Sequence, residues 1–474
     1  MGDVSEIDGE GGGPASTTVD VRRGWRGLMV VLLLFAGVHG WLVATLPEPK
    51  LLGDETNYLE HAYGLVEDGR DTLLIGRLSF DETLTGRGAQ PMFCSHVYAQ
   101  FLEPRDPGDD SLPVPRSLFA VQLVIYLALL LTVWWTAAEL RLGPRTRTAA
   151  VSLLAVFPWH GFFVHALWPE VIHALLLQVV MASCLRFLNG RDGRWLVLGG
   201  AAMAYAAVTK ATFGSYAWPL SALVLGLAWW GARADRGRAL LRAGQALLLP
   251  LVFHLALGAQ LSTNEADGHG RVVGYNRFWA LSWGSTLPAP GEIPGTEGLD
   301  HEAQVLVGFW TQLYANYARG ETIQEREAIA REIFFDHWES APVLDNAARQ
   351  VRKLGWMVRA GRSMFDNASE FERWGPGRVS WIGALRTPAR WLWWGVLGLG
   401  LAGVAALGWR ERGALVLSSA VGFQAVVAFM IPAKPRFLMP AVPILVLFAA
   451  ALLVMLWARA RRAEEPPGAR AIES

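Results

Sequence analysis

Long apolar segments, separated by short polar stretches, dominate the pattern of this sequence. A helix needs about 20 predominantly apolar residues to cross a bilayer. Segments close to that length lie at 28–46, 117–139, 148–164, 167–187, 195–212, 213–230, 240–261, 390–408, 413–431 and 437–457. The pattern therefore predicts an all-α, polytopic membrane protein with about ten transmembrane helices.

Arginine marks alternate loops between these segments. The arginine-rich stretches are Arg141–Arg147, Arg186–Arg194, Arg233–Arg242, Arg410–Arg412 and Arg459–Arg462. In a count of ten helices, all of them fall on the same side as Arg22 and Arg23 near the N-terminus. Because cytoplasmic loops carry the excess of Lys and Arg, we expect both termini to lie in the cytoplasm.

The same pattern divides the chain into five parts. We expect a disordered tail over 1–27, an N-terminal membrane module over 28–261 with its first outer loop at 47–116, a large outer region over 262–389, C-terminal membrane helices over 390–457, and a cytoplasmic tail over 458–474. In the outer region, helical patterns lie at about 301–318, 322–338 and 342–360. The last of them is basic on one face and apolar on the other, as interfacial helices are.

Composition narrows the class of protein further. Of the 474 residues, 52% are hydrophobic and only 18% are charged, and the formal net charge is zero. These values exclude a disordered or fibrous protein, and nothing in them indicates a nucleic-acid partner. The two cysteines, Cys94 and Cys184, fall on opposite sides of the expected membrane, so we expect no disulfide between them.

An acidic pair follows the first apolar segment directly. Asp54 and Glu55 are neighbours, and Tyr58 opens a short amphipathic helix whose apolar side also carries Leu59, Ala62 and Leu65. Adjacent side chains in a regular element point in different directions, so one acid is expected to face a cavity while the other pairs or caps. The sequence leaves open which does which, and both are also consistent with ordinary acids at a helix N-terminus.

Other residues that could take part in binding or catalysis fall on the outer side of the membrane, where Asp54 and Glu55 are also expected. They are Glu170, Lys210, Lys434 and Arg436, together with His165 and His173. Glu170 and His173 share a helix face at i, i+3, which is compatible with a metal site that includes His165. These three residues do not make up a complete set of metal ligands. The alternative is that the histidines form hydrogen bonds within the helix bundle, so the sequence leaves open whether a divalent metal ion is a cofactor.

Four motifs occur in a fixed order along the chain. They are Gly53-Asp54-Glu55 with Tyr58, Trp168-Pro169-Glu170, Val208-Thr209-Lys210, and Lys434-Pro435-Arg436-Phe437. Together they resemble the GT-C superfamily of integral-membrane glycosyltransferases, in particular the bacterial branch related to protein O-mannosyltransferases and the lipid A aminoarabinose transferase. Two positions depart from the family pattern, since Pro169 stands where serine is usual and Lys210 where arginine is usual.

The resemblance implies a GT-C-like helical bundle in the bacterial plasma membrane. It would move a hexose or pentose from a polyprenyl-phosphate donor to a lipid, glycan or protein acceptor at the outer face of that membrane, with inversion. It implies Asp54, or else Glu55, as catalytic base. Tyr58, Glu170, Lys210, Lys434 and Arg436 would then bind substrate. Membrane lipid is an expected partner.

Alternative readings remain for both the residues and the protein. Lys434 and Arg436 are also consistent with basic residues that snorkel to the interface. A transporter or flippase, a polysaccharide polymerase or ligase of the cell envelope, and a catalytically inactive scaffold are the alternative functions. None of them requires an acidic pair directly after the first membrane helix.

Overall fold

The computed structural model of the protein describes residues 16–51, 54–67, 78–79, 90–91, 93–106, 108, 111–266, 271–273, 278, 281, 323–359, 384–409, 411–430 and 435–464. Within these ranges almost every residue in a regular element is helical. The one sheet there is a two-residue antiparallel pair of β1 (Leu78–Ser79) and β2 (Gln90–Pro91). The prediction of an all-α fold is confirmed.

The helices cover the apolar segments of the sequence and several more polar stretches between them. They are α1 (Ser16–Thr45), α2 (Asp54–Glu67), α3 (Phe93–Ala99), α4 (Arg116–Glu139), α5 (Pro144–Ala155), α6 (Pro158–Gly161), α7 (Glu170–Leu188), α8 (Arg194–Thr209), α9 (Ala217–Ala232), α10 (Arg236–Ala246), α11 (Leu248–Ala266), α14 (Ile323–Glu339), α15 (Val343–Arg359), α18 (Arg386–Leu407), α19 (Arg412–Met430) and α20 (Val442–Glu464). Three 3₁₀ segments join them in the described ranges, namely η2 (Phe162–His165), η3 (Ala211–Tyr216) and η4 (Pro435–Ala441).

Among the described residues, eight helices are long and apolar enough to cross a membrane, or up to nine if the bent pair of α5 with 158–165 is one span. The remaining expected segment, 195–212, is α8, which has only 16 residues. The chain is thus a multi-pass membrane protein. Helix α1 begins at Ser16, within the tail that was expected to be disordered, and its candidate span begins at Gly24 rather than at residue 28.

Local sequence sets several of the helix boundaries. Pro144 and Pro158 open α5 and α6, where the missing N–H of proline costs nothing. Asp235 caps α10 by accepting a hydrogen bond from the backbone N–H of Arg238 at 3.1 Å. Pro169 is the N-cap of α7, so this helix begins at Glu170, inside the apolar segment expected at 167–187.

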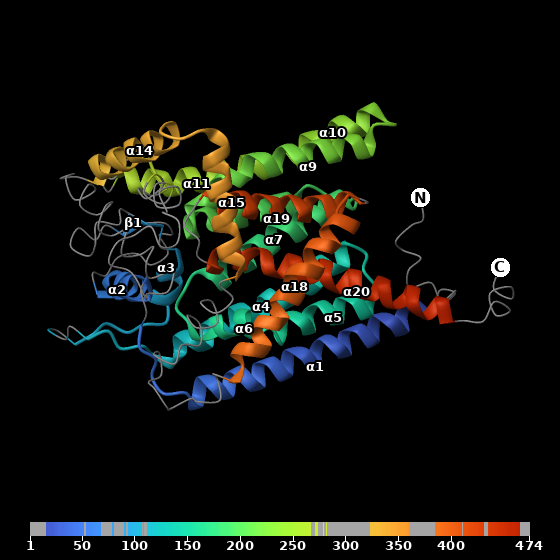
Figure 1. Ribbon diagram of the computed structural model, residues 1–474, viewed down its shortest axis with the longest axis horizontal. Coiled ribbons are helices and arrows are strands. Elements are labelled where there is room, and N and C mark those ends of the chain that lie inside the picture. Colours follow the sequence, from blue (N-terminus) through green and yellow to red (C-terminus); the bar gives the residue numbers. More distant parts are fainter. Residues whose placement is uncertain are drawn as a thin grey trace.

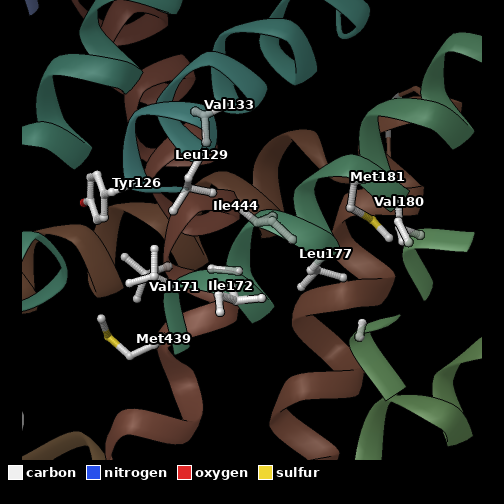
Figure 2. Packing of buried hydrophobic residues seen from close by; sticks show 14 of the residues in the cluster. Tyr126, Leu129, Val133, Val171, Ile172, Leu177, Val180, Met181, Met439 and Ile444 are labelled. Carbon is white, nitrogen blue, oxygen red and sulfur yellow. The ribbon is translucent and has the colours of Figure 1, made fainter. Parts of the chain in front are cut away.

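Most of the long helices run roughly along the horizontal axis of Figure 1, whereas α18 crosses them obliquely and α15 stands upright. Helices α2 and α3 lie at the left end of the bundle. The core lies between α4, α7 and α20. Figure 2 shows side chains from these helices meeting there, among them Leu129, Val171, Ile172 and Ile444, with Met439 from η4 beside them. In lipid, close packing rather than escape from water holds helices together.

Two glycines allow α18 to lie directly against α20. A Cβ atom at Gly403 would stand 2.5 Å from the carbonyl oxygen of Phe448, and one at Gly400 would stand 2.8 Å from that of Leu445. Small residues let helix backbones approach in this way. Any side chain at either position would push the two helices apart.

The structure also describes part of the region between 262 and 389. Helices α14 and α15 match the patterns predicted at 322–338 and 342–360, whereas the one at 301–318 lies outside the described residues. Val343, Leu344 and Val351 of α15 are exposed, as an interfacial helix requires. Cys94 and Cys184 are both free and buried.

Candidate functional site

Helix α2 turns its apolar face, and with it Glu55, into the protein. Tyr58, Leu59, Ala62 and Leu65 are all buried, as their helical spacing predicts. Glu55 lies three residues before Tyr58 and is fully buried with them. Its Oε1 atom accepts a hydrogen bond of 2.6 Å from the backbone N–H of Leu167. One acid of the pair therefore bonds to a loop, as expected for one of two adjacent carboxylates.

That loop, 166–169, runs between η2 and α7 and is buried, so its backbone polar groups need partners inside the protein. Glu55 supplies one of them. Gln122 of α4 supplies others, because its Nε2 atom lies 3.1 Å from the carbonyl oxygen of Ala166 and 3.3 Å from that of Trp168. The loop is thus held between α2 and α4, and this fixes the position of Glu170 at the start of α7.

Glu170 and Lys210 form an ion pair at the same end of the bundle. Glu170 begins α7 and Lys210 follows the last residue of α8. The Nζ atom of Lys210 lies 2.8 Å from Oε1 of Glu170, whose side chain is 1% exposed, against 18% for Lys210. Sequence analysis assigned both to substrate binding, and the structure brings them together.

Tyr98 of α3 joins these groups. Its hydroxyl lies 2.7 Å from Nε2 of Gln122. Burial raises the pKa of Tyr98 well above its usual value, and acidic groups nearby, including Glu55 and Glu170, raise it further. Burial, with a contribution from Glu170, also raises the pKa of the Cys94 thiol on the same helix. Tyr98 and Cys94 therefore stay protonated. Glu55 and Glu170 both lie close enough to Tyr98 to raise its pKa, so the two carboxylates belong to the same site.

The remaining predicted residues are described only in part. Asp54 is the first residue of α2, but its side chain lies outside the described part of the chain. Arg436 belongs to η4, which packs against α7 and α19, while its side chain is likewise not described. Lys434 lies outside the described residues altogether. The backbone of Arg436 thus belongs to an element packed on the helix that Glu170 begins.

The three candidate metal ligands do not form a ligand set. His165 Nε2 lies 3.0 Å from Nδ1 of His39 in α1, whereas Glu170 pairs with Lys210. The ring of His173 meets the ring of Phe213 edge-on, with their centroids 4.1 Å apart. No group of three or more His, Cys, Asp or Glu residues in the described part of the chain could hold a metal ion.

A cavity of about 250 Å³ lies next to His165. Its walls come from the end of α1, the segment after it and the start of α4, and they include Glu48 and Arg116. Arg116 donates a hydrogen bond of 2.6 Å to the carbonyl oxygen of Ala44, which ties α4 to the end of α1. Glu55, Glu170 and Lys210 are not among the residues that line this cavity.

Sequence analysis missed Gln122, Tyr98 and His39. Gln122 and His39 are polar residues inside otherwise apolar segments, which is a usable signal because buried polar groups need hydrogen-bond partners. Nothing in the local sequence singles out Tyr98. Its role follows from α3 packing against α2 and α8.

Comparisons with known proteins give fold neighbours only. No protein-family model matches the sequence, and neither does any curated protein. The chain is similar to the archaeal oligosaccharyltransferase AglB from Archaeoglobus fulgidus in complex with an inhibitory peptide and a dolichol-phosphate, with 14% identity and a TM-score of 0.48 over 93% of this chain and 51% of that one. It is also similar to the Archaeoglobus fulgidus oligosaccharyltransferase in the apo form, with 10% identity and a TM-score of 0.48 over 95% and 52% of the two chains.

The chain spans about half the length of these two structures. Similarity at this level carries no information on the substrate or the chemistry of the protein. The function is therefore argued from the residues of the candidate site.

Proposed function

We propose that this protein is an integral-membrane glycosyltransferase of the GT-C type, which transfers a sugar from a polyprenyl-phosphate donor at the outer face of the plasma membrane. One observation carries the proposal. Glu55, which is bonded to Leu167, and the ion pair of Glu170 with Lys210 gather at one end of the apolar helices. A lipid-linked donor keeps its tail in the bilayer and its phosphate at the interface, so its enzyme needs its polar groups at that depth.

The two acids after the first span then have different roles. Glu55 is a positioning residue, because its carboxylate holds the backbone of the loop before Glu170. Asp54 is the general base that takes the proton from the acceptor hydroxyl. Adjacent helical residues point about 100° apart, so a buried Glu55 is compatible with an Asp54 that faces a different surface.

Cations stabilise the negative charge that gathers on the departing lipid phosphate. Lys210, Lys434 and Arg436 are proposed to supply them, with Lys210 oriented by its pairing to Glu170. The packing of η4 on α7 supports a common location for Arg436 and Glu170. Tyr58 and Glu170 complete the proposed substrate-binding set.

The proposed reaction is a single displacement. The acceptor oxygen, deprotonated by Asp54, bonds to the anomeric carbon as the bond from that carbon to the phosphate oxygen breaks. The leaving group is polyprenyl phosphate, and one displacement inverts the anomeric configuration. The residues proposed as metal ligands do not converge, so no step is assigned to a metal.

The test is consumption of donor by the purified full-length protein in nanodiscs. Polyprenyl-phosphate-linked hexoses and pentoses are offered with a membrane extract as the source of acceptor, and released polyprenyl phosphate is measured. We expect release with at least one donor and loss of release in Asp54→Asn. Movement of donor between leaflets without release would indicate a flippase and contradict the proposal.

A further inference from the structure

A pocket of about 240 Å³ lies at the arginine-rich end of the bundle. It is bounded by the loop between α4 and α5 with the first turn of α5, by the turn between α18 and α19 with the residues on either side of it, and by the middle of α20. Gln122 of the candidate site and Leu140 of the pocket are about 27 Å apart along α4, at a rise of 1.5 Å per residue. The pocket is therefore separate from the candidate site, and nothing in the proposed transfer reaction uses it.

The walls of this pocket are apolar and its rim is charged. Leu447, Phe448, Ala451, Val454 and Met455 form a wall along α20. Arg141, Arg147 and Glu411 supply the charged groups, which leaves a net charge of plus one. An apolar wall beside a positive rim matches a molecule with an anionic head and an apolar tail.

Arg141 has a backbone conformation that its residue type disfavours. Its φ angle is +58°, and apart from glycine no other described residue has a positive φ. Arg141 lies just beyond the end of α4. Its backbone N–H donates a hydrogen bond of 2.9 Å to the carbonyl oxygen of Ala138, and the N–H of Leu142 donates one of 3.1 Å to the carbonyl oxygen of Ala137. This is a Schellman motif, whose left-handed position is normally glycine.

Strained residues of this kind cluster where the side chain has a task. The guanidinium of Arg141 is solvent-exposed at the rim of the pocket. Arg147 is fixed beside it, because its Nε atom donates a hydrogen bond of 2.6 Å to the carbonyl oxygen of Leu142. One arginine in the loop and one in the first turn of α5 thus lie at the same rim.

We propose that this pocket binds the phosphate headgroup of an anionic phospholipid, with Arg141 as its principal contact. Basic pockets between membrane helices on the arginine-rich side suit such headgroups. The volume is slightly below the range of about 300–1,000 Å³ typical of small-molecule sites, which fits a headgroup and the first part of an acyl chain. The wall from Leu447 to Met455 extends along about 12 Å of helix. The rest of the lipid's acyl chain would lie in the bilayer.

The experiment measures lipid binding to the full-length protein in detergent. Phosphatidylglycerol is titrated and the bound lipid is counted by native mass spectrometry, with phosphatidylcholine, which is zwitterionic and has no net charge, as the comparison. Arg141→Gly removes the guanidinium and introduces the residue that the φ angle favours, so the fold is retained. We expect this variant to bind phosphatidylglycerol on the order of tenfold more weakly, the value of a lost charge-assisted hydrogen bond, and to unfold in the absence of lipid at an unchanged or higher temperature.

Two further variants separate the pocket from general surface charge. Arg145→Ala removes an exposed arginine from the first turn of α5, outside the pocket lining, and is expected to keep the wild-type affinity. Ala451→Phe fills the apolar wall without changing charge and is expected to weaken binding. Equal affinity in Arg141→Gly and the wild type, equal losses in Arg141→Gly and Arg145→Ala, or equal binding of phosphatidylcholine would each overturn the proposal. Complete displacement of lipid by inorganic phosphate at equal concentration would overturn it in favour of a soluble ligand.

Discussion

The carboxylate of Glu55 accepts a hydrogen bond of 2.6 Å from the backbone N–H of Leu167, across 112 positions of sequence. This contact ties α2, which follows the first membrane span, to the loop that sets the start of α7. It means that a residue with the appearance of a catalytic acid has a second task, because it satisfies a buried backbone donor.

Removal of the Glu55 carboxyl group should destabilise the protein. Glu55→Ala leaves the N–H of Leu167 buried without this acceptor, which costs about 1–3 kcal/mol. Glu55→Gln keeps an oxygen that can accept the bond, so its loss should be clearly smaller. Thermal unfolding in detergent, followed by intrinsic tryptophan fluorescence, measures both. Equal unfolding temperatures for the two variants would show that the contact with Leu167 contributes nothing.

Asp54→Asn should abolish most of the transfer activity and leave stability unchanged. The amide keeps the size of the side chain but cannot take a proton, so the expected loss is about 10²- to 10⁴-fold in turnover. Glu55→Gln is the matched control, since it changes the adjacent acid in the same way and should cost less turnover. If both variants transfer sugar at nearly the wild-type rate, neither acid is the base.

The Glu170–Lys210 pair should behave as a coupled unit. Lys210→Met leaves a buried carboxylate without this cation, and loss of one partner of a buried pair costs about 3–5 kcal/mol. Adding Glu170→Gln should recover much of that stability, because the buried charge is then gone too. A double-mutant cycle of unfolding free energies gives the coupling, and effects that simply add would exclude it. The double variant should stay inactive, since the proposed phosphate contact is still missing.

Arg436 and Lys434 should affect donor affinity more than turnover of bound donor. Arg436→Ala and Lys434→Ala remove proposed phosphate contacts, so a weaker apparent donor affinity is expected. Arg436→Lys should also bind more weakly if the contact is bidentate, because lysine offers only a point charge. Binding of a polyprenyl-phosphate analogue to the purified variants measures this directly. Wild-type affinity in both alanine variants would remove these residues from the site.

The orientation of the protein in the membrane is testable with introduced cysteines. Cys94 and Cys184 are buried and so give little background labelling. A membrane-impermeant maleimide should react with Thr296→Cys in intact cells, and with Ala234→Cys only after permeabilisation, because the arginine-rich loop that holds Ala234 is predicted to be cytoplasmic. The reverse pattern would invert the topology and place the candidate site on the inner face.

Much of the fold was determined by local sequence. Apolar segments near the length of a membrane span predict helices whatever their neighbours are, because each helix satisfies its own backbone hydrogen bonds. The buried face of α2 followed from helical spacing in the same way. Sequence predicted a membrane span over 195–212, whereas helix α8 ends at Thr209 and has only 16 residues. An apolar segment does not show where its helix ends.

The pairing of side chains was decided by the tertiary structure alone. Sequence placed Glu55, Glu170 and Lys210 on one side of the membrane, but it could not show that Glu55 bonds to Leu167 or that Lys210 bonds to Glu170. It also grouped His165 with Glu170 and His173, whereas the structure joins His165 to His39, 126 positions away. Helix formation depends on near neighbours along the chain, while these contacts depend on how separate helices cross. That arrangement is set by the packing of the whole bundle, which no single segment encodes.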